Sequence, residues 1–343
     1  GVQNVTLTAA NASGTDTKTL VLTIHELPQI TSALTATAQV GTPFTYTLTA
    51  TGYPAPTFNA TGLPAGLTFN GVDSITGTPA ASGVFNVALT ASNAAGTDTE
   101  TLVLTVNELP LITSVLTATA QVGTPFNYTI TATGFPVPTF NATGLPAGLT
   151  FNGNNAITGT PTANGVFNVT LTATNAAGTD TETLVLTINE VPQITGALTA
   201  TAQVGVPFTY TITATGFPAP TFNATGLPAG LTFNGNNAIT GTPPASGEFN
   251  VTLTATNAAG TDTKTLVLTV NEIPQITSAL AATALVGTPF TYTITATGNP
   301  PITFGAANLP AGLTFNGVAS ITGTPTASGV FNVTLTATNA AGT

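Results

Sequence analysis

The amino-acid sequence predicts an all-β protein built as a tandem array of β-sandwich modules. Three observations lead to this prediction. The same phrase recurs every 82 residues, hydrophobic residues alternate with polar ones, and glycine and proline interrupt the alternation at short intervals.

The repeat has a constant length. Equivalent phrases begin at Pro28, Pro110, Pro192 and Pro274, with neighbouring prolines 82 residues apart and no insertion or deletion between them. Each complete module is long enough to bury a small core of its own. The predicted domains are residues 1–27 (the C-terminal part of a module), complete modules 28–109, 110–191 and 192–273, and residues 274–343 (a module without its last strand).

Period-two alternation predicts the strands. Within residues 44–51, apolar side chains take one parity and threonine takes the other, and residues 85–92 and 101–106 repeat the scheme. Side chains predicted to point inward include Phe44, Tyr46, Leu48, Ala50, Leu102, Leu104 and Val106.

Turn signals such as Asn70-Gly71 separate about seven short strands in each module, a pattern typical of an immunoglobulin-like sandwich. At the first complete junction, Leu109-Pro110 leads directly into the next module without a glycine. Because proline fixes its own φ and favours an extended preceding residue, the sequence predicts limited bending between modules.

Four phrases carry a resemblance to a known family. Residues 62–69 (GLPAGLTF), 75–79 (ITGTP), 83–87 (GVFNV) and 93–97 (NAAGT) resemble the immunoglobulin-like, He-PIG-type repeats of very large bacterial and archaeal surface proteins. The resemblance covers nearly the whole chain. It implies an extracellular stalk, adhesin extender or filament, and it brings no catalytic motif.

Composition excludes several classes of function. Only 4% of residues are charged, the net charge is −10, and Lys and Arg together number two, so binding to nucleic acid or to an anionic membrane is not expected. Absence of cysteine excludes disulfides and cysteine-based metal sites. His25 is the only histidine, so the inventory for nucleophilic catalysis is missing and no enzyme is predicted.

Paired acids are the candidates for metal binding. Asp98 and Glu100 share one strand face, as do Asp180 and Glu182, and such pairs could hold calcium. Calcium takes six to eight oxygens, however, and each junction adds mainly one acid: Glu26, Glu108, Glu190 or Glu272. The alternative interpretation is a charged edge strand that discourages unwanted pairing.

Lysine occupies the Glu100 position in two other repeats, at Lys18 and Lys264. An intramolecular isopeptide bond would need a buried lysine, whereas these two are predicted on the polar face of their strand. Threonine rows also resemble ice-binding surfaces, but a twisted sandwich lacks the flat face required. Sequons that are candidates for glycosylation occur at Asn59, Asn141, Asn168, Asn223, Asn250 and Asn332.

Three aromatic residues, Tyr53, Phe135 and Phe217, occupy a Gly-x-Pro turn and form the candidate interface with a neighbouring module, a glycan or a protein. The alternative interpretation is that they close the end of the sandwich. Asn299 replaces them in the last module, so the fold does not need the aromatic ring.

The ends of the chain leave two alternatives open. Residues 1–15 occupy the same repeat positions as residues 329–343, and the last module lacks equivalents of residues 98–108, which we expect to leave a sheet edge exposed. Either the chain is a window of a longer array, which the duplicated positions favour, or residues 16–27 of a neighbouring chain supply the missing strand.

Together these observations predict the structural repeat region of an extracellular or cell-surface fibrous protein. Its stacked modules would set reach and stiffness, and its low surface charge would permit self-association into rods or filaments. No cofactor is expected. The alternative is a set of adhesin modules that recognise a glycan or a protein.

Overall fold

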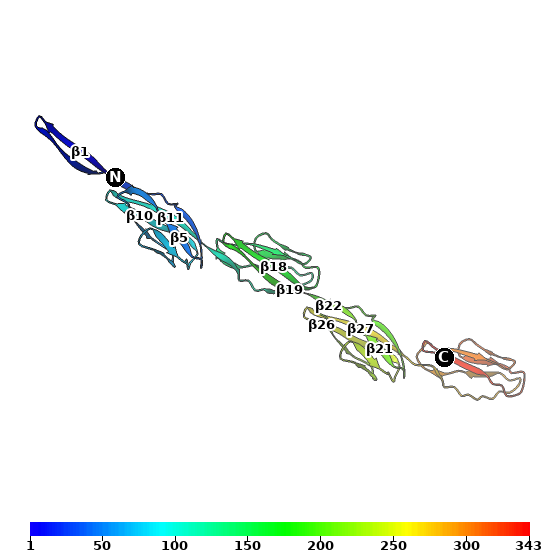
Figure 1. Cartoon of the computed structure of the whole chain (residues 1–343). Coiled ribbons are helices and arrows are strands. Elements are labelled where there is room, and N and C mark those ends of the chain that lie inside the picture. The colour runs from blue at the N-terminus through cyan, green and yellow to red at the C-terminus, as the bar shows by residue number, and fades with distance from the viewer. The chain divides into compact units, whose positions relative to one another are not determined.

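The computed structural model describes residues 1–343 and contains strands and no helix (Figure 1). It therefore offers no helical segment that could cross a membrane. The chain divides into two compact units, Gly1–Thr187 and Ile188–Thr343.

The first unit begins with an isolated antiparallel hairpin, β1 (Val2–Asn11) and β2 (Gly14–Thr23), whose residues are all exposed. Module 28–109 follows. Its strands are β3 (Glu26–Ile30), β4 (Thr35–Gln39), β5 (Phe44–Thr47), β6 (Ala50–Tyr53), β7 (Thr57–Thr61), β8 (Leu67–Phe69), β9 (Ser74–Gly77), β10 (Gly83–Asn93) and β11 (Gly96–Ile112).

Two sheets make the sandwich of this module. One has the order β4-β11-β10-β7, with β4 parallel to β11, and the other has the order β5-β9-β8. Strands β3 and β6 form a separate antiparallel pair. Counting β3 with β4 and β5 with β6 as interrupted strands gives seven, which confirms the predicted immunoglobulin-like sandwich.

The predicted strand 44–51 has the right inward parity but is not continuous. It breaks at Leu48, which is 2% exposed, and the two halves pair with different strands, β5 with β9 and β6 with β3. Because of the break, the two halves of one chain segment belong to two different sheets, a property that alternation alone does not encode.

The core lies between the two sheets. Leu102, Leu104 and Val106 of β11 are fully buried, as predicted, and they join Ile75, Leu89 and others in one cluster. Burial of each large aliphatic side chain contributes about 1.5–3 kcal/mol. The same cluster recurs in module 192–273 around Ile239, Leu253 and Leu266.

Two glycines explain the Leu-Pro-x-Gly-Leu and Ile-x-Gly-Thr-Pro phrases. A Cβ on Gly66 would lie 2.0 Å from the carbonyl oxygen of Thr78, and one on Gly77 would lie 2.2 Å from the carbonyl oxygen of Gly66. The backbones of the β8 and β9 hairpin therefore approach each other at a distance that only glycine permits.

Module 110–191 repeats this architecture with the sheet orders β12-β19-β18-β15 and β13-β17-β16. Its strands are β12 (Thr117–Gln121), β13 (Phe126–Thr129), β14 (Ala132–Phe135), β15 (Thr139–Thr143), β16 (Leu149–Phe151), β17 (Ala156–Gly159), β18 (Gly165–Asn175) and β19 (Gly178–Ile194).

In the second unit, module 192–273 contains β20 (Thr199–Gln203), β21 (Phe208–Thr211), β22 (Ala214–Phe217), β23 (Thr221–Thr225), β24 (Leu231–Phe233), β25 (Ala238–Gly241), β26 (Gly247–Asn257) and β27 (Gly260–Asn271). Residues 274–343 contain β28 (Gln275–Ile276), β29 (Phe290–Thr293), β30 (Ala296–Thr297), β31 (Thr303–Ala307), β32 (Leu313–Phe315), β33 (Ser320–Gly323) and β34 (Thr334–Thr338). In this last segment Leu280, Leu285 and Val330 are exposed.

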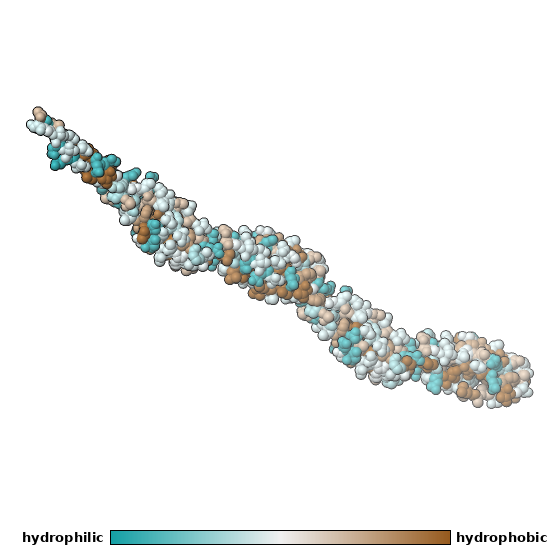
Figure 2. Space-filling view, in the orientation of Figure 1, coloured by the Kyte–Doolittle hydropathy of each residue, from teal (hydrophilic) through white to brown (hydrophobic).

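The surface is weakly polar rather than charged. Most of the face seen in Figure 2 is pale, the colour of residues near the middle of the hydropathy scale, with small scattered teal and brown groups. Threonine on the outward parity of the strands accounts for this character, because alternate positions such as Thr45 and Thr47 are exposed.

Candidate functional site at the module junctions

No linker separates modules 28–109 and 110–191. Strand β11 continues for 17 residues from the last strand of one module into the first strand of the next, where it pairs with β14. Pro110 lies inside the strand at a register shift between Glu108 and Leu111. The prediction that Leu109-Pro110 leads directly into the next module agrees with this geometry.

An asparagine in the hairpin turn of each module binds this junction. Nδ2 of Asn175 donates to the carbonyl oxygens of Glu108 (2.8 Å) and Pro136 (2.9 Å), and its Oδ1 accepts from the N–H of Ala177 (2.8 Å). The same amide group therefore holds the junction, the loop after β14 and its own turn. Equivalent donations to the preceding glutamate carbonyl come from Asn93, Asn257 and Asn339.

An aspartate near the start of the second hairpin strand holds the first strand of the module. Oδ2 of Asp180 accepts the backbone N–H of Ile112 at 2.7 Å. Asp98 does the same for Ile30 (2.7 Å), and Asp262 for Ile194 (2.8 Å). These hydrogen bonds satisfy N–H groups that the interrupted first strand leaves without a ladder partner.

Glu108 accepts hydrogen bonds from its own module and from the following module. Its carboxylate accepts from the Ser82 hydroxyl at 2.8 Å, within module 28–109, while its carbonyl accepts from Asn175 of the following module. Glu272 repeats this arrangement with Ser246 (3.3 Å) and Asn339 (2.8 Å). Bonds from both sides make the glutamate a direct connection between adjacent modules.

Close packing accompanies the hydrogen bonds. A Cβ on Gly178 would lie 2.7 Å from Cδ2 of Leu109, and a Cβ on Gly134 would lie 3.0 Å from the Cα of Pro110. The Leu-Pro pair of the junction is therefore seated against two glycines of the following module.

The candidate interface aromatics lie at the same junctions. Tyr53, Phe135 and Phe217 are half-buried and pair across the strands with Glu26, Glu108 and Glu190. In the last module, Asn299 replaces the ring, and its Oδ1 accepts from the N–H of Glu272 at 2.9 Å. Binding of a glycan or protein by these aromatics remains a prediction.

Two of the four calcium candidates, Asp98 and Asp180, have a structural role. Asp98 and Asp180 hold strand N–H groups, and Glu100 and Glu182 lie beside them on the same half-buried face. Residues 96–102 of β11 pair with β10 alone, so this stretch is a sheet edge. No group of three or more His, Cys, Asp or Glu side chains converges to hold a metal ion. Each pair therefore supplies few of the six to eight oxygens that calcium takes.

The predicted strand face is wrong for Lys264. Lys264 has the parity of the buried residues Leu266 and Leu268, not the polar parity. Its ammonium group nevertheless reaches solvent and lies 3.6 Å from Asp262, with 44% of the side chain exposed. A long flexible stem allows this, since lysine keeps its charged end in water.

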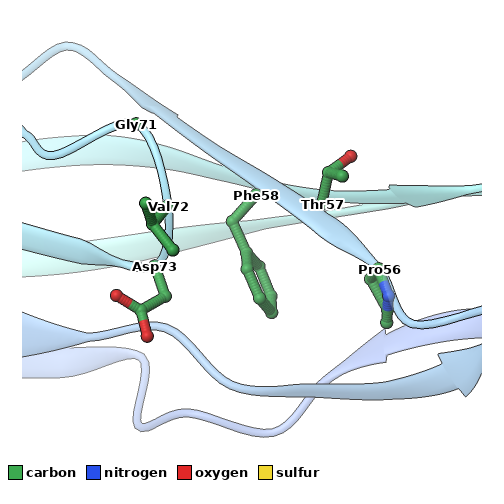
Figure 3. Close-up of a pocket in the computed structure, with 6 residues that line it drawn as sticks. All are labelled: Pro56, Thr57, Phe58, Gly71, Val72 and Asp73. Carbon is green, nitrogen blue, oxygen red and sulfur yellow. The ribbon is translucent and has the colours of Figure 1, made fainter.

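A hollow of about 360 Å³ lies on the surface of module 28–109. Pro56, Thr57 and Phe58 line one side, and the turn Gly71-Val72-Asp73 lines the other (Figure 3). The Phe58 ring is drawn between Pro56 and Asp73.

Sequence reasoning missed Asn175 and Ser82 and assigned no such role to Glu108. The available signal was the repetition of Asn-Ala-Ala-Gly-Thr, which indicated only the family resemblance.

Comparison with known proteins agrees with this architecture. The model of the He_PIG family, described as "Putative Ig domain", matches residues 27–107, 109–189, 191–271 and 274–343. The chain belongs to this family.

A curated relative is the "Serine-rich adhesin for platelets" of Staphylococcus aureus, which is 36% identical over 129 residues. That alignment covers 35% of this chain and 6% of the adhesin, and it covers 10% of the protein from strain MRSA252. The He_PIG repeats here thus match a small part of a bacterial surface adhesin.

Among solved structures, a mutated three-domain immunoglobulin fragment of titin has a TM-score of 0.52 at 15% identity, covering 72% of this chain and 99% of its own. An I-band fragment of titin has a TM-score of 0.51 at 15% identity, covering 73% and 99%. At this identity the likeness shows the tandem immunoglobulin fold alone.

Proposed function

We propose that these He_PIG repeats form a structural extender of a cell-surface protein, a stalk or filament whose modules set reach and stiffness, and that they have no enzymatic activity. The observation that carries the proposal is the junction glutamate. Glu108 is bonded by Ser82 of the preceding module and by Asn175 of the following one, on the 17-residue strand β11 that the two modules share.

Three further observations support this role. The junctions lack glycine linkers, the surface carries little charge, and a bacterial surface adhesin contains related repeats. Linkers rich in glycine would let modules reorient freely, whereas a bonded strand resists bending. A location at the cell surface rests on that relative and on the family.

Small-angle X-ray scattering of the whole chain tests the extender function. We expect a distance distribution with one long dimension, and we expect N175A to broaden that distribution because it removes two hydrogen bonds at one junction. N59A is the matched control, since Asn59 is an exposed asparagine on β7, away from any junction. A compact distribution for the native chain would contradict the proposal.

A second candidate function is recognition of a glycan or protein by Tyr53, Phe135 and Phe217. The half-buried position of these rings and the similarity to an adhesin favour it. The triple variant Y53A/F135A/F217A should then lose binding to host-cell glycoproteins, whereas undiminished binding would exclude these rings as the site.

A further inference from the structure

Every module carries an Asn-Gly dipeptide in the same turn. In module 28–109 it joins β8 to β9. The four dipeptides are Asn70-Gly71, Asn152-Gly153, Asn234-Gly235 and Asn316-Gly317, and both residues of each are exposed.

The asparagine oxygen of this turn accepts three backbone hydrogen bonds. Oδ1 of Asn70 lies 2.8 Å from the N of Val72, 3.0 Å from that of Asp73 and 2.9 Å from that of Ser74. The side-chain oxygens of Asn152, Asn234 and Asn316 accept the same three bonds at 2.9–3.1 Å.

Three N–H groups around one carbonyl oxygen have the arrangement of an oxyanion hole. If a nucleophile attacks Cγ of Asn70, the negative charge develops on Oδ1, where the three donors already point. The nearest internal nucleophile is the backbone nitrogen of Gly71. No hydrogen bond involves this N–H, and a Cβ placed on Gly71 would have no other atom within 4 Å.

Only in module 28–109 does a carboxylate accept a hydrogen bond from the side-chain nitrogen that would leave as ammonia. Oδ1 of Asp73 accepts from Nδ2 of Asn70 at 3.3 Å and is itself positioned by the Ser74 hydroxyl at 2.8 Å. Asp73 also lines the hollow of about 360 Å³ drawn in Figure 3. The equivalent residues in the other modules are Asn155, Asn237 and Ala319.

We propose that these turns, and Asn70-Gly71 above all, are sites of spontaneous deamidation promoted by the fold. The Gly71 nitrogen loses its proton and forms a bond to Cγ of Asn70, and the Cγ–Nδ2 bond breaks to release ammonia. Water then opens the cyclic imide to aspartate or isoaspartate. The Asp73 carboxylate stabilises the positive charge on the departing nitrogen as it gains a proton.

The aspartate product fits the same turn. Its carboxylate would accept the three N–H bonds, and bonds to a charged acceptor are stronger than bonds to an amide oxygen. Each conversion adds one negative charge to a chain that has few charges, so ageing of the array would gradually increase repulsion between neighbouring copies.

The test follows intact chain in neutral buffer by peptide mapping and mass spectrometry, scoring conversion of each asparagine to its acid. We expect Asn70 to convert faster than Asn152 and Asn234, and all of them to convert faster in the folded chain than in urea. Asn59, which alanine follows, should remain unmodified. Faster conversion in urea would mean that the three N–H groups protect the amide, and would overturn the proposal.

Two variants separate the contributions of Asp73 and Gly71 to the deamidation of Asn70. D73N copies the natural Asn155 and Asn237, so the turn should fold. We expect this variant to slow the deamidation of Asn70 about tenfold. The effect is smaller than that of a buried general acid or base because Asp73 is partly exposed. An unchanged rate would overturn the role of Asp73. G71A, which has room for its Cβ, should slow Asn70 but not Asn152.

Discussion

At the scale of single residues, the repeats depend on glycine where backbones meet and on asparagine where loops must be held. Gly66 lies too close to the Thr78 backbone, and Gly77 too close to the Gly66 backbone, for any side chain, whereas Gly71 is required only for its φ of 79°. The three positions look alike in the sequence, but the physical reasons for glycine differ.

This difference makes a prediction. G66A should destabilise module 28–109 by more than about 4 kcal/mol, because the new Cβ would overlap the Thr78 carbonyl. G71A should cost only about 1–2 kcal/mol, the price of a left-handed φ in open space. Thermal unfolding of the two variants measures the difference, and equal melting temperatures would show that the hairpin can separate to admit a side chain.

Tyr210 makes the stability of the folded chain depend on pH in the alkaline range. Burial raises the pKa of its hydroxyl above the ordinary value of 10.0, and the hydroxyl donates to the carbonyl of Ala197 at 2.5 Å. Since the folded state favours the neutral phenol, the unfolded chain loses its proton first. This contribution to stability is complete below pH 10 and is lost as the pH rises through the folded-state pKa.

Urea unfolding across this pH range should therefore show stability falling more steeply for the native chain than for Y210F, which has no proton to lose. Parallel pH profiles for the two proteins would contradict the assignment.

At the scale of elements, the first strand of each module is held by side chains from the hairpin rather than by a continuous ladder. Asp180 binds the N–H of Ile112, and Asn175 binds the carbonyl of Glu108 from the turn of the same hairpin. A strand interrupted by proline can thus be anchored on both sides of the interruption.

We expect D180A to release this anchor. The amide of Ile112 should lose about tenfold in protection from hydrogen exchange, the equivalent of a hydrogen bond to a charged acceptor in a half-exposed setting. D180N should retain most of the protection because it keeps an acceptor oxygen. The amide of Ile30, held by Asp98, is the internal control, and unchanged protection at Ile112 in D180A would show that strand pairing alone suffices.

At the scale of the whole molecule, the near absence of charge governs how copies meet. Charged residues are 4% of the chain, and most of the visible surface is neither strongly polar nor apolar (Figure 2). Repulsion between copies is correspondingly weak, so we predict that chains associate side by side.

Raising the salt concentration should then change self-association little, because salt acts by screening charges that are mostly missing. Analytical ultracentrifugation at low and high ionic strength checks this. A strong salt dependence would show that the few acids, such as Glu100 and Glu182, control association.

The sequence by itself determined the repeat, the sandwich and the core. Alternation placed Leu102, Leu104 and Val106 inside, and the spacing of Leu-Pro-x-Gly-Leu and Ile-x-Gly-Thr-Pro indicated the family, because local periodicity is a direct record of which face each side chain takes. The same parity places Lys264 with Leu266.

Only the tertiary structure decided what the polar residues do. Asn175 and Glu108 are 67 residues apart, and Asp180 and Ile112 are 68 apart, yet each pair is joined by a hydrogen bond. Their partners are backbone atoms, which every residue possesses, so no residue type marks them in the sequence. The fold alone brings a particular carbonyl or N–H within reach, and for this reason the junction became visible as a site only in three dimensions.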